Sequence, residues 1–409
     1  MARISIVTSG HFCTNPRVWR EADALSGAAH EVTVIGVNFD PVQADLDRKM
    51  LQTRLWRYRA GADIRGQTAA SRMRREWYRL RSRIGRMHVR RGDPDPHALG
   101  YAVTCLLDAA RDEAADLTIV HLEPAFWVGV QLLGDGHRVG ADFEDWHSEN
   151  SSRGTSPGRI GEFLATLERR LMESTMHRTT TSKALAKALG RRYAASEPEV
   201  IYNSVASPPF RPRARDDGLV RMVWFSQTLG SGRGLEDLFL ALPMLRGNWR
   251  LELRANASAE ATAWVRRLVP ASLMERVQIA PTVPPGELSE FVARNDIGFA
   301  LEVPACRNKD LTASNKIFEY LQSGLAVVAS DTAGQKEVLE KVAGAGEIYT
   351  SGNPAELAMR LNRWLDAPAE LAALRPRIHA EANACFAYEH QRPRLLASVE
   401  RALSEGVRR

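Results

Sequence analysis

The stretch 314–330 constrains the fold more than any other part of the sequence. Apolar residues such as Ile317 and Leu321 recur in its first half at helical spacing, which predicts an amphipathic helix facing a core. Gly324 is placed to end this helix in a left-handed conformation. The following run, 325–329, is continuously apolar, as expected of a strand that helices cover on both faces of a parallel sheet. The sequence therefore predicts an α/β fold.

One residue of the predicted helix, Glu319, points to a ligand. It lies beside Phe318 in a helix that must pack tightly, and a carboxylate in such a place needs hydrogen-bond donors. A pair of ligand hydroxyl groups would supply them. The free N–H groups of the helix N-terminus, where Ser314 is the expected N-cap, would bind a phosphate. The helix would then hold both the ribose and the diphosphate of a nucleotide. A buried glutamate in a structural salt bridge is the alternative.

The motif N-K-I-F-E-Y-L-x-x-G-L-x-V-V-A-S-D at 315–331 resembles the donor-site helix of retaining GT-B glycosyltransferases, the large family four. The resemblance implies two Rossmann-like α/β domains that face each other across a cleft. It also implies donor contacts from Ser314, Asn315 and Lys316, and binding of the ribose hydroxyls by Glu319. The implied substrate is a nucleotide-sugar, and neither a cofactor nor a metal is expected.

Further donor-side positions follow from the same resemblance. Gly10 lies in the first β-α loop, where a family glycine lets the backbone approach the donor, although a simple turn glycine is the alternative. Arg233 and Gly234 fall where the family has a basic residue followed by glycine. Thr282 lies where family backbone groups contact the nucleotide base. We expect all four residues at the donor site.

Two positions depart from the family pattern. Thr228 stands where the family usually has a second arginine, so half of the expected cationic clamp is missing. Leu311 stands where the family often has the first of two glutamates, and the adjacent Asp310 is a candidate replacement from a shifted loop. Arg307 and Lys309, together with Lys316, are candidates for the charge lost at Thr228. Both departures leave the strength of catalysis open.

The acceptor side is predicted at two strand ends. His121 ends the strand D-L-T-I-V-H, and ligands of α/β proteins bind beyond the carboxyl ends of strands. Asp145 and His147 lie in the loop E-D-W-H-S-E-N, which resembles the family segment facing the cleft. The resemblance implies that His121 and Asp145 orient the sugar and the acceptor. A structural histidine and a plain acidic loop are the alternatives.

The length of 409 residues predicts two domains, since it exceeds what one core usually organises. The segment E-V-I-Y-N-S-V resembles the end of the family's first domain, and the proline-rich stretch 207–212 then reads as a linker. We expect a Rossmann-like acceptor-side domain at 1–206 and a nucleotide-sugar-binding domain at 207–387. The last helix, 388–409, is expected to cross back onto the first domain.

The four cysteines are far apart and show no metal-ligand spacing, which is typical of reduced thiols in a cytoplasmic protein. No apolar run approaches the ~20 residues of a membrane span. We therefore expect a cytoplasmic protein. The basic stretch described next favours a peripheral position at the inner face of the membrane.

Basic residues are concentrated in the stretch 48–91. It contains fifteen Lys or Arg against Asp63 and Glu76, a local charge of +13; since the whole chain carries +6, the rest carries −7. An apolar stripe steps through it at helical spacing: Met73, Trp77, Leu80, Ile84 and Met87. A basic amphipathic helix of this kind indicates a membrane-surface element. Two alternatives stay open: the stripe packs on its own domain, or the arginines bind an anionic acceptor or nucleic acid.

Together these features predict a retaining, metal-independent glycosyltransferase. Its partners would be a nucleotide-sugar donor and a glycan, lipid-linked or small-molecule acceptor, with no nucleic acid expected. One alternative is a nucleotide-sugar 2-epimerase, which uses the same architecture with carboxylates as acid and base. The other is a non-catalytic binding protein with a decayed donor site, in which the basic helix is the working part.

Overall fold

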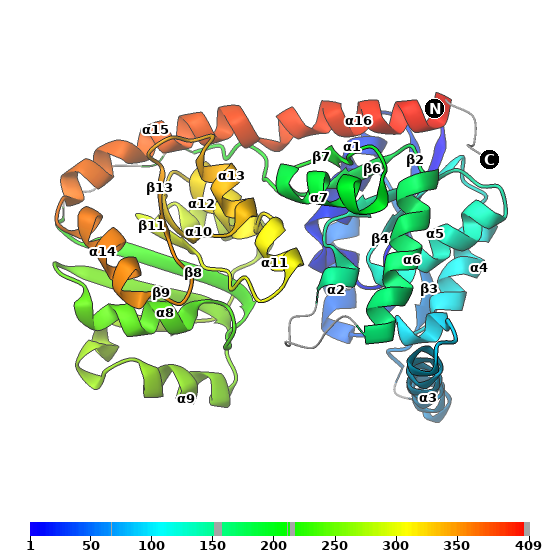
Figure 1. Cartoon of the computed structure of the whole chain (residues 1–409), viewed down its shortest axis with the longest axis horizontal. Coiled ribbons are helices and arrows are strands. Elements are labelled where there is room, and N and C mark those ends of the chain that lie inside the picture. Colours follow the sequence, from blue (N-terminus) through cyan, green and yellow to red (C-terminus); the bar gives the residue numbers. More distant parts are fainter. Residues whose placement is uncertain (67, 151–157, 211, 213–216, 405–409) are drawn as a thin grey trace. The chain divides into compact units, whose positions relative to one another are not determined.

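The computed structural model describes residues 1–66, 68–150, 158–210, 212 and 217–404 (Figure 1). The chain divides into two compact units. The first runs from the N-terminus to Ile201 and also contains residues 306–308 and the chain from Arg392 onward. The second contains residues 202–305 and 309–391.

The first unit is built on a sheet of seven strands in the order β3-β2-β1-β4-β5-β6-β7, in which all neighbours are parallel. The strands are β1 (Arg3–Val7), β2 (Glu31–Asn38), β3 (Arg57–Asp63), β4 (Leu117–His121), β5 (Val139–Phe143), β6 (Arg178–Thr180) and β7 (Glu199–Val200). The helices are α1 (Pro16–Ser26), α2 (Pro41–Leu51), α3 (Ala69–Arg91), α4 (Val103–Glu113), α5 (Glu123–Gly134), α6 (Gly158–Ser174) and α7 (Lys183–Tyr193). Short 3-10 helices are η1 (Phe12–Thr14), η2 (Pro96–Ala98) and η3 (His147–Glu149). The chain reverses its direction of travel across the sheet between β1 and β4, which makes this the topological switch point.

The second unit repeats the plan with six parallel strands in the order β10-β9-β8-β11-β12-β13. The strands are β8 (Val220–Thr228), β9 (Trp249–Asn256), β10 (Val277–Ala280), β11 (Ile297–Ala300), β12 (Ala326–Ser330) and β13 (Gly346–Tyr349). The helices are α8 (Leu235–Ala241), α9 (Ala259–Leu268), α10 (Leu288–Val292), α12 (Asn315–Gln322), α13 (Ala333–Leu339), α14 (Pro354–Leu365) and α15 (Pro368–Phe386). Two further helices, α11 (Arg307–Leu311) and α16 (Tyr388–Ser404), have residues in both units. The expected pair of Rossmann-like sheets is confirmed.

Apolar runs form the strands and place the cores, as hydrophobic burial requires. Every residue of β4, β5, β11 and β12 is buried. In the first unit, the core contains Ile4, Ile6 and Phe12, and it also contains Val399 and Ala402 of α16. The last helix is therefore part of the first unit's core.

The basic stretch 48–91 is not one element. It comprises the end of α2, the edge strand β3 and the helix α3, and Trp56 within it is buried in the core of the first unit. The predicted apolar stripe lies entirely on α3, where its side chains are exposed. The alternative in which this stripe packs on its own domain is therefore wrong. Among the described residues, no helix combines the length and apolar character needed to cross a bilayer.

Gly324 ends α12 with φ 79°, as predicted from its position. A Cβ at this position would come within 2.3 Å of Pro212 Cγ, whereas Gly352 has φ 86° and open space around it. Both Gly→Ala substitutions incur a left-handed backbone penalty of about 1–2 kcal/mol. We expect Gly324→Ala to lower the free energy of unfolding further than Gly352→Ala does, as measured by urea denaturation. Equal losses would show that Pro212 does not crowd the helix end.

Candidate active site

The loop after β8 lies against the end of β11, at the switch point of the second sheet. Gly234, the N-cap of α8, has φ 73°, a conformation that favours glycine. A Cβ on Gly234 would come within 2.7 Å of the Leu301 Cβ, so a larger residue would push the loop away. Ligands of open α/β sheets bind at such switch points, beyond the carboxyl ends of the strands.

Arg233 is oriented by hydroxyl groups of the preceding strand, β8. Its guanidinium donates to Ser226 Oγ at 2.7 Å and to Thr228 Oγ1 at 3.2 Å. Thr228, which stands where the resembled family usually has an arginine, carries no charge but accepts a hydrogen bond from Arg233. A fixed guanidinium at a β-α loop is suited to an anionic ligand such as a diphosphate.

Lys316, in the first turn of α12, pairs with a carboxylate that the sequence analysis did not single out. Its Nζ lies 3.3 Å from Glu302 Oε1, two residues beyond β11. Burial alone would raise the pKa of Glu302, but Lys316 and Lys309 outweigh burial and lower it. Ser314 is at the N-cap position, yet its hydroxyl does not cap the helix and instead bonds to Glu302. The expectation of a hydroxyl cap is wrong, because Glu302 is the stronger, charged partner.

Glu319 is 5% exposed and points to the neighbouring helix α10, where Ser289 Oγ donates to its carboxylate. The hydrogen bond from Ser289 shows that the buried carboxylate has a donor within its own unit. Ser289 is a second residue that the sequence did not identify. Its hydroxyl can rotate, so it can share the carboxylate with a ligand hydroxyl.

The other predicted donor positions differ in their surroundings. Thr282, just beyond β10, is exposed and its Oγ1 lies 3.5 Å from Asn256 Oδ1, at the end of β9. Asn315 is exposed at the first position of α12. Parallel strands bring Thr282, Arg233 and Glu302 to the same edge of one sheet.

Asp310 does not act as a free replacement for the missing glutamate. Its Oδ1 accepts from the backbone N–H of Ala333, the first residue of α13, at 3.0 Å. A carboxylate is stabilised at a helix N-terminus. The geometry therefore does not support Asp310 as a replacement for the glutamate missing at position 311, because its carboxylate caps α13.

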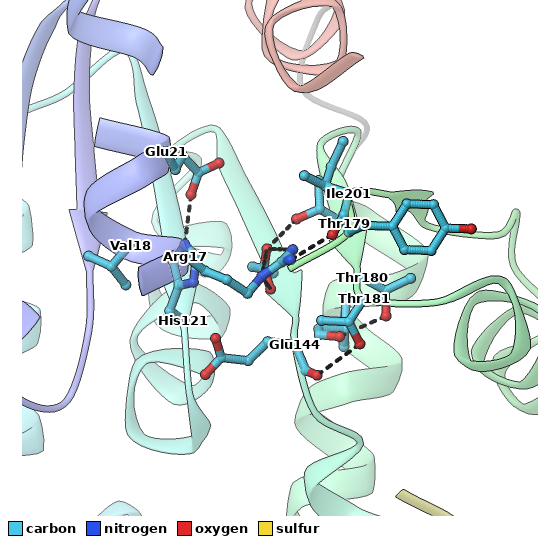
Figure 2. Close-up of polar contacts among 12 residues, drawn as sticks. Arg17, Val18, Glu21, His121, Glu144, Thr179, Thr180, Thr181 and Ile201 are labelled. Atoms are coloured by element: carbon cyan, nitrogen blue, oxygen red, sulfur yellow. Dashed lines mark hydrogen bonds and ion pairs between the residues drawn. The ribbon is translucent and has the colours of Figure 1, made fainter. Parts of the chain in front are cut away.

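In the first unit, His121 is fully buried at the end of β4 (Figure 2). Its Nε2 lies 2.7 Å from Glu21 of α1, and the other oxygen of Glu21 lies 3.3 Å from His177 Nε2. Burial alone would lower the pKa of His121, but Glu21 and Asp142 raise it. The two histidines lower the pKa of Glu21 to about 2 against its burial. The arrangement favours a charged imidazolium inside the domain.

Arg17 of α1 completes this buried charge network. Its Nε donates to both oxygens of Asp142 at 3.0 and 3.1 Å, and its Nη1 donates to the carbonyl of Ile201 at 2.7 Å. Burial alone would raise the pKa of Asp142, but Arg17 lowers it, whereas burial and Asp142 together raise the pKa of Glu144. His121, Asp142 and Glu144 offer ligand atoms within 4.8 Å of one another, a spacing that a metal ion could bridge. Both Asp142 oxygens are already engaged by Arg17.

Asp145 is held at the end of the same loop. Its Oδ1 accepts from Asn308 Nδ2 at 2.8 Å, while the Asn308 Oδ1 accepts from the backbone N–H of Trp146 at 2.7 Å. Asn308 thus fixes the conformation of the loop that carries Asp145. Asp145 is only partly buried.

Gly10 has no left-handed backbone, and a Cβ there would meet only the Phe39 ring at 3.6 Å, an ordinary contact. The protein's own packing therefore does not require glycine at this position. Room beside Gly10 is compatible with close approach by a donor, and this role stays a prediction.

Glu123 is a third residue that the sequence analysis did not identify. It follows Leu122, whose φ of 72° is unusual for a bulky residue and turns the chain sharply from β4 into α5. Glu123 Oε1 lies 3.4 Å from His147 Nδ1. Burial alone would lower the pKa of His147, but Glu123 raises it to about 9. The pair joins the two loops in which His121 and Asp145 were predicted to act.

The raised pKa of His147 predicts a pH dependence of stability. The pair stabilises the fold fully below the unfolded-state pKa of about 6.5, and this contribution disappears as pH rises through about 9. We expect Glu123→Gln to remove about 1–3 kcal/mol at pH 6.5 and less at pH 9.5, as measured by urea denaturation. Glu162→Gln, at an exposed position of α6, is the control. A loss that does not change with pH would contradict the account.

Comparison with known proteins relates part of the sequence to a described family. Residues 239–397 match the model of a family described as glycosyl transferase-like. No curated protein matches the sequence at a significant level.

Three solved structures illustrate the likeness in fold. Sucrose-phosphate synthase from Thermosynechococcus elongatus has a TM-score of 0.70 and 14% identity, over 98% of this chain and 99% of that chain. Anabaena HepE, in complex with UDP and glucose, has a TM-score of 0.70 and 14% identity, over 98% and 100% of the two chains. S. aureus TarM, as a mutant in complex with Fondaparinux, alpha-GlcNAc-glycerol and UDP, has a TM-score of 0.68 and 8% identity, over 99% and 100%. The resemblance seen in the sequence is confirmed: the chain has the GT-B fold of these glycosyltransferases, and its residues 239–397 match the model of a glycosyl transferase-like family.

Proposed function

We propose that the protein is a retaining glycosyltransferase that moves a sugar from a nucleotide-diphosphate-sugar to a hydroxyl group of a glycan acceptor. The family match and the GT-B fold support glycosyltransferase function. The observation that carries the proposal is that Arg233 and Lys316 lie beyond the ends of the neighbouring strands β8 and β11, while buried Glu319 follows Lys316 by about one turn of α12. The two cations suit the negative charge of a diphosphate, and the carboxylate can accept hydrogen bonds from the ribose hydroxyls.

These groups would bind the donor from the second unit. Glu319 would accept hydrogen bonds from the ribose hydroxyls, sharing its carboxylate with Ser289. The diphosphate would lie at the N-terminus of α12, near Lys316, and on the loop of Arg233. Solved structures of HepE contain UDP and UDP-glucose, which favours a uridine nucleotide as the first donor to test.

The reaction would follow a front-face course. The acceptor oxygen forms a bond to the anomeric carbon as the bond to the diphosphate oxygen breaks on the same face. The acceptor proton passes to the departing phosphate oxygen, so the products are a glycoside and a nucleoside diphosphate. The charge that develops on the phosphate is stabilised by Arg233, Lys316 and the amides of α12. This scheme requires no metal and no cofactor.

Asp145 is the acceptor-side residue that we propose, because Asn308 holds its carboxylate and the residue is only partly buried. His121 is fully buried and pairs with Glu21. We therefore propose that it balances the buried negative charge beneath this loop and does not contact the sugar. TarM is described with the glycan Fondaparinux, which favours a glycan acceptor. A lipid-linked or envelope glycan is our finer proposal. The comparisons favour neither a 2-epimerase nor a non-catalytic binding protein.

Removing the ribose-binding carboxylate tests the donor site. We expect Glu319→Gln to weaken UDP binding by about 10- to 100-fold, because a charged acceptor of hydrogen bonds is lost. Isothermal titration calorimetry with UDP, and with GDP and ADP in parallel, measures the effect. Glu290→Gln, at an exposed position of the neighbouring α10, is the matched control. Unchanged affinity of Glu319→Gln for a nucleotide that the wild type binds would reject this site.

The stereochemistry of the product tests the proposed reaction. With an α-linked UDP-sugar and a panel of glycoside acceptors, we expect the first product to have an α-anomeric configuration in ¹H NMR. A β-configured product would refute retention. An epimerised sugar released without acceptor would instead identify the epimerase.

A further inference from the structure

The helix α3 packs on the first unit through a narrow face of small residues. Ser82, Gly85 and Val89 are buried, and a Cβ on Gly85 would come within 2.7 Å of the Ala98 backbone nitrogen in η2. His88 Nδ1 bonds to an Asp95 oxygen at 2.9 Å, which further fixes the helix. The orientation of α3 on its unit is therefore set by close backbone packing.

The face opposite this contact carries the apolar stripe. One turn takes 3.6 residues, so the stripe residues share a face about half a turn from Ser82 and Val89. The exposed fractions of the stripe are 73% for Met73, 56% for Trp77, 47% for Leu80, 36% for Ile84 and 48% for Met87. Soluble proteins rarely expose such a continuous set of large apolar side chains unless it binds something. Figure 1 shows α3 at the margin of its unit.

Arginines line both sides of the stripe. The exposed ones are Arg72, Arg74, Arg79, Arg81, Arg83, Arg90 and Arg91. Glu76, the acidic residue of the helix, pairs with Arg79 at 2.6 Å. The Arg81 guanidinium lies 6.0 Å from the Trp77 ring centroid. The helix thus presents an apolar centre between two positively charged borders.

We propose that α3 is a docking surface for an anionic lipid bilayer, lying in the membrane interface with its stripe toward the acyl chains. The arginines on both borders would then meet lipid phosphates while Trp77 lies among the headgroups. This proposal does not depend on the proposed function, but it would hold the enzyme near lipid-linked acceptors.

Charge and apolar character together favour this partner over the others. A second copy of the helix would bring two rows of arginines together, and like charges repel. Nucleic acid would pair with the arginines but would leave the aliphatic stripe in water. A bilayer with anionic headgroups satisfies both parts of the surface.

Vesicle cosedimentation of the full chain tests the proposal. We expect binding to vesicles of phosphatidylcholine with phosphatidylglycerol, weak binding to phosphatidylcholine alone, and a loss of binding as salt rises. The stripe variant Trp77→Gln with Leu80→Gln should lower the partition at least about 10-fold. Its matched control, Leu240→Gln with Met359→Gln, changes equally exposed apolar residues on the second unit.

A second pair of variants tests the charged borders. Changing Arg72, Arg74 and Arg83 to Gln should weaken binding and flatten its salt dependence, whereas the same change at the exposed Arg250, Arg266 and Arg267 should not. An unchanged free energy of unfolding in urea shows that each variant is folded. Unchanged vesicle binding of the stripe variant overturns the proposal. Absence of vesicle binding by the wild type also overturns it. In that case, a stripe variant that dissociates a dimer would identify a second copy as the partner, and one that loses DNA binding would identify nucleic acid.

Discussion

The close contact between Gly234 and Leu301 is the feature on which the candidate donor site depends. In a parallel sheet all carboxyl ends lie at one edge, and the loops diverge only where the chain changes direction. In the second unit this point lies between β8 and β11. Because Gly234 has no side chain, the loop of Arg233 can lie against the end of β11. Glu302 comes two residues beyond this strand end and pairs with Lys316. One left-handed glycine thus lets the loop of Arg233 approach the strand end that leads to Glu302.

The first unit is organised by a different interaction, a cluster of buried charges. Isolated buried charges are costly, so each member must have an opposite partner. Arg17 neutralises Asp142, while His121 and His177 share Glu21. Because these residues come from α1, β4, β5 and the segment before β6, the network joins the elements next to the β1–β4 switch point. The loop of Asp145 therefore begins from a rigid base.

Local patterns in the sequence predicted the elements, because apolar runs and glycine stops act over a few residues. The helix at α12, its end at Gly324, the strand β12 and the burial of Glu319 were all predicted. Glu302, Ser289 and Glu123 were not, since their significance depends on neighbours distant in sequence. The role of Ser314 was wrong for the same reason, because Glu302 outcompetes the backbone. A carboxylate two residues beyond a buried strand is the signal that could have identified Glu302.

Hydrogen–deuterium exchange with and without UDP tests the central claim most directly, since it locates a ligand on the described chain. The account predicts slower exchange in the loop 229–235 and in the first turn of α12, because both would lie against the diphosphate. Protection confined to the first unit, or no protection at UDP concentrations that saturate binding, would contradict the assignment of the donor site to this edge of the sheet.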